Sequence, residues 1–261
     1  MRSLSFSMLS LVLALGSLLA LEALPFAQEQ GAKTEWRETA KISLDRPFEL
    51  YDREKIENGR VIERSTWRTN PAGFNLEDIR HGLTVRYYDD GTISSESWYS
   101  MNIHHGPSRE WYRSGQLKRE LSSVEGRAHG LERIWYDGGQ LRMERPYLGG
   151  RVTGTFKEWN EKGQQVESTE YKWGKRTGLH TAWHENGNTR ETGEYVGDLK
   201  SRRWTYWHEN GQKQSEGEYQ LFRPLGQDDV DSRKVGEWKF WDEEGKLIRT
   251  VDHGEPEPDE D

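Results

Sequence analysis

The strongest constraint on this chain is a glycine spacing that repeats along most of its length. A leading glycine, once replaced by arginine, is followed nine residues later by a trailing glycine, and the first six pairs recur every 24 residues. The seventh pair follows after ten additional residues. The leading positions are Gly82, Gly106, Gly130, Gly154, Gly178, Arg202 and Gly236, and the trailing ones are Gly91, Gly115, Gly139, Gly163, Gly187, Gly211 and Gly245. Such a period predicts a stack of one small structural unit.

An aromatic residue lies five positions after every leading residue. The first is Tyr87, and the others are tryptophans that we call the tryptophan ladder: Trp111, Trp135, Trp159, Trp183, Trp207 and Trp241. A second aromatic column follows each trailing glycine at a distance of eight residues: Tyr99, Tyr147, Tyr171, Tyr195 and Tyr219, with Ser123 and His253 in place of Tyr. We expect tryptophans of one strand and tyrosines of the next to stack along a sheet.

Each unit has the pattern of a β-hairpin. In one unit, Gly178 to Trp183 predicts a strand, His184 to Gly187 a turn, and Asn188 to Tyr195 a second strand. Polar residues that end on a fixed glycine favour a turn whose last residue has a positive φ. The leading glycines fall within strands, where glycine weakens pairing. We therefore expect a neighbouring aromatic ring to lie over each of them.

These patterns predict an all-β fold, an elongated single-layer twisted antiparallel sheet built from tandem 24-residue β-hairpins. Aromatic residues on both faces of the later strands indicate that the C-terminal units are better buried than the middle ones. The expected parts are a signal peptide (1–27), a polar lead-in (28–50), a degenerate capping repeat with an insertion (51–80), seven hairpin repeats (81–252, with an insertion at 222–234) and a disordered acidic tail (253–261).

Composition supports a thin structure and limits its partners. The hydrophobic fraction is 32%, yet there are 12 Trp and 11 Tyr, so aromatic side chains must supply most of the buried area. The net charge of −8 disfavours nucleic acid and simple electrostatic docking on anionic lipid. The chain has no cysteine, which excludes disulfides, thiol catalysis and cysteine-based zinc sites.

The N-terminus has the pattern of an export signal. An apolar run from Leu9 to Leu21 is too short for a comfortable membrane span and suits the hydrophobic region of a signal peptide. We expect cleavage after Ala27 and an exported protein in the periplasm, cell envelope or medium. The alternative is an uncleaved N-terminal anchor, because Pro25 fits the cleavage rule poorly.

The combined pattern of Gly, Trp, Gly and Tyr resembles the MORN repeat, in the variant grouped with putative bacterial antitoxin proteins. The resemblance covers about Asp52 to Asp252. It implies stacked β-hairpins in one long sheet, and a role as a membrane-associated or protein-docking scaffold or as the antitoxin of a toxin pair. The chain departs from the pattern at Arg202, at Asn160 and in the insertion between Phe222 and Lys234.

The sequence predicts no catalytic residue, cofactor or metal. His81, His105 and His129 recur one unit apart, which corresponds to roughly 9–10 Å, too far for two imidazoles on one zinc ion. His184 and His208 fail the same test. Glu96, Glu120, Glu144 and Glu216 are better explained by cross-strand pairing with Lys or Arg. Asp228, Asp229 and Asp231 lack the pattern of a calcium loop, and a solvated acidic loop explains them better.

We therefore expect a non-catalytic exported scaffold that binds a protein partner. One alternative is a glycan-binding module that uses the tryptophan ladder, although the ladder is also explained as structural core. A second alternative is the antitoxin role, which requires a cytoplasmic chain. The identity of the partner and the binding face do not follow from the sequence.

Overall fold

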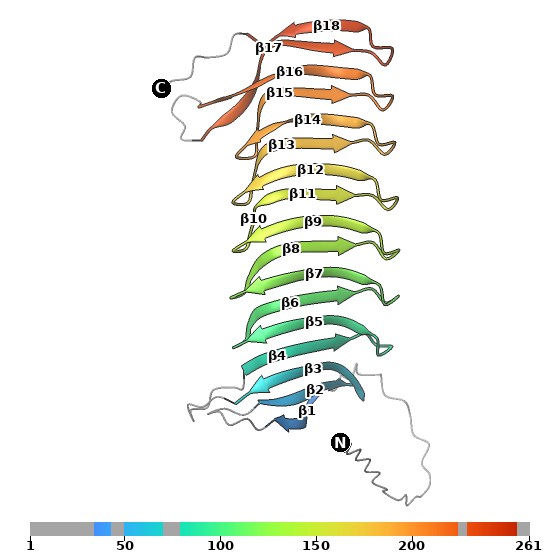
Figure 1. Cartoon of the computed structure of the whole chain (residues 1–261), viewed down its shortest axis with the longest axis vertical. Coiled ribbons are helices and arrows are strands. Elements are labelled where there is room, and N and C mark those ends of the chain that lie inside the picture. The colour runs from blue at the N-terminus through green and yellow to red at the C-terminus, as the bar shows by residue number, and fades with distance from the viewer. Residues whose placement is uncertain (1–33, 43–49, 70–78, 224–228, 255–261) are drawn as a thin grey trace, which may run out of the picture. The chain divides into compact units, whose positions relative to one another are not determined.

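The computed structural model describes residues 34–42, 50–69, 79–223 and 229–254, and they form one antiparallel sheet of 18 strands (Figure 1). These residues contain no helix, and the predicted all-β fold of stacked hairpins is confirmed. No helix among them is long and apolar enough to cross a membrane. The predicted signal peptide and the acidic segment 255–261 lie outside the described residues.

Each strand pairs with the one that follows it in the sequence. The exception among the described strands is at β9, because β10 and β11 both pair with β9 and not with each other. The strands are β1 (Thr34–Ile42), β2 (Leu50–Glu57), β3 (Arg60–Arg68), β4 (Ile79–Tyr87), β5 (Ile93–Ser100), β6 (Ile103–Trp111), β7 (Leu117–Val124), β8 (Arg127–Trp135), β9 (Leu141–Leu148), β10 (Arg151–Val152), β11 (Gly154–Trp159), β12 (Gln165–Lys172), β13 (Lys175–Trp183), β14 (Thr189–Val196), β15 (Leu199–Trp207), β16 (Lys213–Phe222), β17 (Asp231–Trp241) and β18 (Leu247–Asp252). Strand β1 lies in the segment 28–50, for which the sequence predicts no repeat.

The trailing glycines close the hairpin turns as predicted. The N–H of Gly91 donates to the carbonyl of Tyr88 at 3.0 Å, and Tyr88 N–H donates to the carbonyl of Thr92 at 2.8 Å. Gly91 has a φ of 86°, in the left-handed region that favours glycine. The other six trailing glycines have the same conformation and the same turn hydrogen bond. The hairpin turn is thus built from one repeated conformation.

The leading glycines allow a bulge at the junction between hairpins. Ser97 of β5 opposes Ser108 of β6, but Tyr99 opposes His104, so the β6 segment is two residues longer. Gly106 lies in this segment with a φ of 108°, and the other leading glycines also have positive φ. Arg202 keeps the conformation without a glycine, at a φ of 59°. Positive φ is the feature that all seven leading positions share, and it explains why glycine is favoured in this column.

The expectation of a ring over each leading glycine is wrong. A Cβ on Gly82 would meet Thr66, and one on Gly154 would meet Pro146. Among the six leading glycines only Gly106 faces an aromatic residue, and the contact is with the Cβ and Cγ of Trp98. A Cβ on Gly178 would meet the side chain of Glu170, whereas Gly130 and Gly236 have no atom within 4 Å of an added Cβ. An aromatic cover is therefore not what the leading glycine provides.

The core is a column of residues two positions after each leading residue. Its side chains alternate onto one face of the sheet, which we call face A. All members except Ser108 are buried: Thr84, Glu132, Phe156, His180, Trp204 and Trp238. The sequence analysis missed this buried column, because its members share a position and a face but no residue type.

Aromatic rings cover glycines in the C-terminal units, at positions that the sequence analysis did not single out. A Cβ on Gly193 would lie 2.2 Å from the Trp204 ring, and one on Gly217 would lie 2.3 Å from the Trp238 ring. Tyr195 packs edge-on against Trp204 with ring centroids 5.0 Å apart, and Trp204 and Trp238 are almost wholly inaccessible to solvent. The predicted better burial of the C-terminal units is confirmed.

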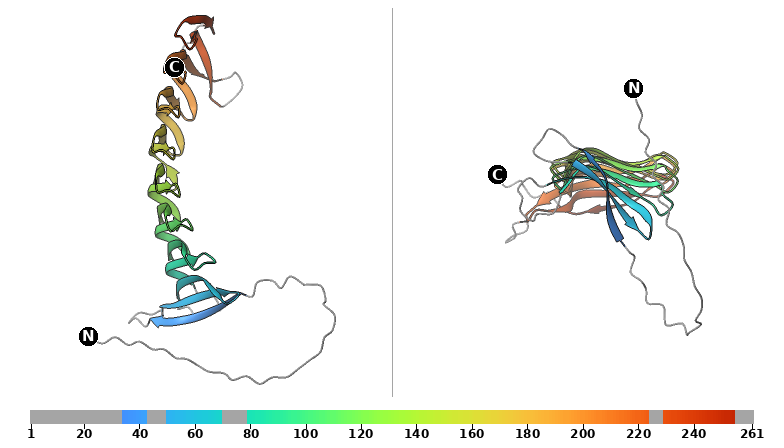
Figure 2. Two further views of the ribbon diagram at one scale, coloured as in Figure 1. Left: turned by 90° about the vertical axis from the view of Figure 1, so that its right-hand side faces the viewer. Right: turned by 90° about the horizontal axis from the view of Figure 1, so that it is seen from below.

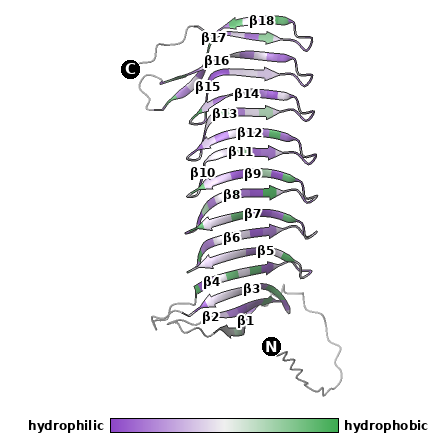
Figure 3. Cartoon of the chain, viewed as in Figure 1, coloured by the Kyte–Doolittle hydropathy of each residue, from purple (hydrophilic) through white to green (hydrophobic). Residues whose placement is uncertain are grey.

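Ion pairs replace aromatic packing in the middle of the sheet. Figure 3 shows hydrophilic residues along these strands, and Figure 2 shows the sheet edge-on as a single layer. On the opposite face, face B, Glu120 and Glu144 both bind Arg133, at 3.0 and 2.9 Å. On face A the buried Glu132 binds Arg119 at 2.7 Å. The predicted cross-strand pairing of the glutamate column is confirmed, since Glu96 and Glu120 both oppose Arg109 and Glu216 opposes Lys239.

Replacing Gly193 with alanine should destabilise the protein. The added Cβ would overlap the Trp204 ring, which has no room to move, so we expect a loss of about 1–3 kcal/mol in the free energy of unfolding. Urea denaturation followed by circular dichroism measures it. Gly138→Ala is the matched control, because Gly138 has no positive φ and no atom within 4 Å of an added Cβ. Equal stability of the two variants would contradict the packing described here.

Candidate binding surfaces

The tryptophan ladder lies at the ends of the first strands, just before the hairpin turns. All six ladder tryptophans are partly buried and none belongs to the buried core. In the described part of the chain no ring–ring contact includes a ladder tryptophan. The predicted stacking of Trp on Tyr is therefore wrong. Tyr171, Tyr195 and Tyr219 pack instead on Phe156, Trp204 and Trp238 of the buried column.

The ladder tryptophans join hairpins through their backbone. The first residue of each turn reaches one unit along the sheet and hydrogen-bonds the carbonyl oxygen of the next ladder tryptophan. Tyr112 Oη donates to Trp135 O at 2.8 Å, and His184 Nε2 bonds Trp207 O at 2.9 Å. The same contact is made by Tyr88 to Trp111, Tyr136 to Trp159 and His208 to Trp241. The polar residue that follows each ladder position in the sequence could have indicated this contact. Asn160 is the exception, because its side chain bonds Gln164 instead.

Two cavities adjoin at the hairpin-turn end of strands β14 to β18. One has a volume of about 640 Å³ and is lined by His184, Tyr206 and Trp207 among others. The second has a volume of about 470 Å³ and is lined by Phe240 and Trp241. Both cavities include His208 and Gln214, so they adjoin at these residues and are taken together as one groove. We call it the turn groove. It contains two ladder residues, Trp207 and Trp241.

An apolar patch lies on face B of strands β5 to β9. Side chains two residues apart in a strand point to the same face. Trp98 is two residues from Glu96 and Leu131 is two residues from Arg133, so both lie on face B. The same alternation adds Ile103, Val124 and Leu148. These five side chains, which we call the apolar patch, are 36–49% exposed. The sequence analysis missed the patch, although Val124 and Leu148 occupy one column of the repeat.

Comparison with known families identifies the repeat. The profile of the MORN repeat variant matches residues 105–124, 128–148, 203–221 and 234–253. Each match covers one hairpin, from the first strand through the turn to the second strand. Four hairpins of the chain match the MORN repeat variant. No curated protein sequence is similar enough to indicate a relative. The match identifies the repeat type, and the antitoxin role stays a prediction.

The histidines of the sheet do not come together. Of the predicted column, His105 and His129 are exposed, while His81 is partly buried. Burial, together with the charge of Arg68, lowers the pKa of His81. Within the described ranges no group of three or more His, Asp or Glu side chains is placed to hold a metal ion. The side chains of His184 and His208 form the hydrogen bonds to backbone carbonyl oxygens described above.

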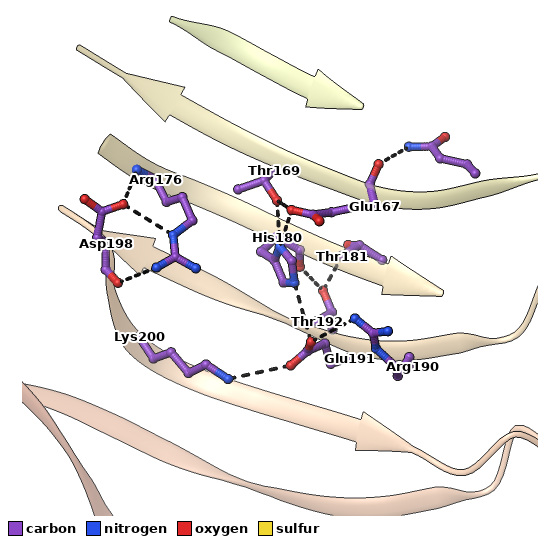
Figure 4. Close-up of polar contacts among 11 residues, drawn as sticks. Glu167, Thr169, Arg176, His180, Thr181, Arg190, Glu191, Thr192, Asp198 and Lys200 are labelled. Atoms are coloured by element: carbon purple, nitrogen blue, oxygen red, sulfur yellow. Dashed lines mark hydrogen bonds and ion pairs between the residues drawn. The ribbon is translucent and has the colours of Figure 1, made fainter. Parts of the chain in front are cut away.

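A polar network around the buried Thr169 and His180 lies on face A of the sheet at β12 to β15 (Figure 4). Thr169 Oγ1 donates to Glu167 at 2.8 Å and lies 2.7 Å from His180 Nδ1. His180 Nε2 lies 3.8 Å from Glu191, whose other oxygen lies 3.6 Å from Lys200 Nζ. Thr169 has no exposed surface, so this hydroxyl cannot meet a substrate. The network joins four strands through side chains.

Charge balance in the network depends on Glu191. The His180 imidazole lowers the pKa of Glu191 to about 2, burial opposes this, and the charges of Lys200 and Arg190 add to it. Burial in turn lowers the pKa of Lys200, whose Nζ lies 2.8 Å from Tyr206 Oη and 3.9 Å from the centroid of the Trp204 ring. The partly buried Lys200 is therefore held by one carboxylate, one phenol and one indole face.

Glu191→Gln should destabilise the protein at neutral pH. Because folding lowers the pKa of Glu191 from 4.5 to about 2, its contribution is complete above pH 4.5 and is lost as the pH falls from 4.5 through about 2. We expect a loss of at most about 3 kcal/mol at pH 7 and a much smaller one at pH 2.5. Urea denaturation at both pH values measures the difference. Glu185→Gln in the exposed turn is the control, and an effect of Glu191→Gln that does not change with pH would contradict this assignment.

Proposed function

We propose that the protein is a non-catalytic, exported scaffold that docks a protein partner through the apolar patch. The observation that carries the proposal is the patch itself. Trp98, Ile103, Val124, Leu131 and Leu148 expose large apolar side chains on one face of neighbouring strands. Several large apolar side chains exposed on one face of neighbouring strands are typical of the centre of a protein interface.

The surroundings of the patch also favour a protein partner. The adjacent row on face B holds Arg109, Glu120, Arg133 and Glu144, which alternate in charge and pair with one another. A row of paired charges beside apolar side chains resembles the polar rim of an interface. In the C-terminal half of the same face charged residues occupy several of the corresponding positions, as at Glu170, Glu194 and Arg203, and the exposed apolar residues there are Leu179 and Val196. Docking is thus assigned to β5–β9.

A non-catalytic role agrees with the environment of the polar residues. Thr169 and His180, the pair that most resembles a nucleophile and its base, lie beneath the surface of the sheet. Reactive groups need access to a substrate and a site that can enclose it. Export rests on the N-terminal segment 1–27 alone.

The double variant Trp98→Ser, Leu131→Ser should lose most of its partner binding. We expect at least about a 10-fold weaker association, because central aromatic and aliphatic side chains carry much of the binding energy of an interface. Quantitative cross-linking of the purified protein in envelope extract, followed by mass spectrometry, measures the captured partner. Leu179→Ser is the matched control, since Leu179 is 54% exposed on the same face outside the patch. Equal capture by the double variant and the control would refute the docking assignment.

A further inference from the structure

The turn groove runs across several hairpins. Its first cavity extends from His184 after β13 to Gln214 of β16, and its second continues to Ile248 and Arg249 of β18. Neighbouring strands are roughly 5 Å apart, so the groove covers about 20 Å along the sheet. The two volumes, about 640 and 470 Å³, lie within the range of small-ligand sites. This length and continuity suit a linear ligand with several similar segments.

Aromatic residues line the groove along its whole length. Tyr206 and Trp207 line the first cavity, and Phe240 and Trp241 line the second. They come from equivalent positions of consecutive hairpins, so each of the two hairpins contributes two adjacent aromatic residues to the groove. Aromatic side chains combine a large apolar surface with a polar edge. Such pairs suit a ligand whose units have apolar faces.

The groove also carries hydrogen-bonding groups that no other described residue engages. The Nε2 atoms of His184 and His208 bond the carbonyl oxygens of Trp207 and Trp241, so their Nδ1 atoms are left as acceptors. Among the described residues, no hydrogen bond includes the exposed side-chain amide of Gln214, which can both donate and accept. These groups fit hydroxyl groups on a ligand.

The charges along the groove are balanced. Glu209 and Glu243 contribute two carboxylates, and Arg190 and Arg249 contribute two guanidinium groups. The fifth charge, Glu191, lies within reach of His180 and Lys200. A strongly anionic or cationic ligand would therefore leave one set of these groups uncompensated. A neutral polar ligand fits the lining best.

The backbone at this end of the sheet is occupied. His208 N–H bonds Gln212 O, and Asp242 N–H bonds Lys246 O, both within turns. A peptide that bound by adding a strand would need free backbone groups along its path. Recognition in the groove therefore depends on side chains, which favours rings edged with hydroxyl groups over an extended peptide.

We propose that the turn groove binds a single strand of a neutral, linear polysaccharide. Sugar rings lie against Trp207 and Trp241, and their hydroxyl groups bond Gln214 and the two histidines. Successive sugars occupy the two cavities, so affinity grows with the length of the chain. The groove lies in β14–β18 and the apolar patch in β5–β9, so this site is independent of the proposed protein docking.

The test is a titration of the full-length protein, followed by tryptophan fluorescence and calorimetry. The probes are the β-1,4-linked tetramers of N-acetylglucosamine and of glucose, each with its monosaccharide. We expect at least one tetramer to bind at least 10-fold more tightly than its monomer. Gln214→Ala should weaken that binding at least 5-fold. Lys118→Ala, the equivalent exposed position of the β6–β7 hairpin, should leave it unchanged.

The outcomes separate the groove from the rest of the protein. Trp207→Ala should also weaken tetramer binding, with its circular dichroism spectrum checked for intact folding, whereas the patch variant Trp98→Ser, Leu131→Ser should bind the tetramer normally. Lack of binding by both tetramers at millimolar concentration would overturn the proposal. Equal affinity for monomer and tetramer, or an unaffected Gln214→Ala variant, would do the same. Displacement of the tetramer by a proline-rich peptide would reassign the groove to a protein ligand.

Discussion

A single-layer sheet must bury side chains against those of its own neighbouring strands. Here the buried column of face A meets that requirement in two ways. In the C-terminal units Trp204 and Trp238 fill the space above Gly193 and Gly217. The largest core side chains therefore pack over glycines, which have no side chain beyond a hydrogen atom. In the middle units Glu132 takes the same position and is held by Arg119. One backbone therefore supports an aromatic and an ionic core.

The repeat period follows from three backbone devices rather than from the core. The trailing glycine closes the turn, the leading glycine permits the bulge between hairpins, and the ladder tryptophan offers its carbonyl to the preceding turn. Each device needs one residue type or one conformation at a fixed place. Because these demands do not involve the core, residues of the buried column can vary from Thr84 to Trp238 without disturbing the stack.

This division explains which features could be predicted from the sequence. The turn at Gly91 and the hairpin fold could, since backbone conformations with positive φ require glycine in register. The core could not, because Thr84, His180 and Trp204 share no residue type. The ring contacts were assigned to the wrong residues for the same reason: Gly193 and Gly217 share one repeat position, but no other repeat has a glycine there. The turn groove and the apolar patch depend on three-dimensional neighbours, and only a few of their members, such as Val124 and Leu148 or His184 and His208, are 24 residues apart.

The core composition implies that stability is uneven along the sheet, and amide hydrogen exchange followed by mass spectrometry tests this most directly. Fraying from the ends alone would protect the middle strands best. If the buried column determines stability, the slowest exchange should instead lie in β14–β17, around Tyr195, Trp204 and Trp238, with faster exchange in β5–β8. Uniform protection, or a maximum in β5–β8, would contradict the account.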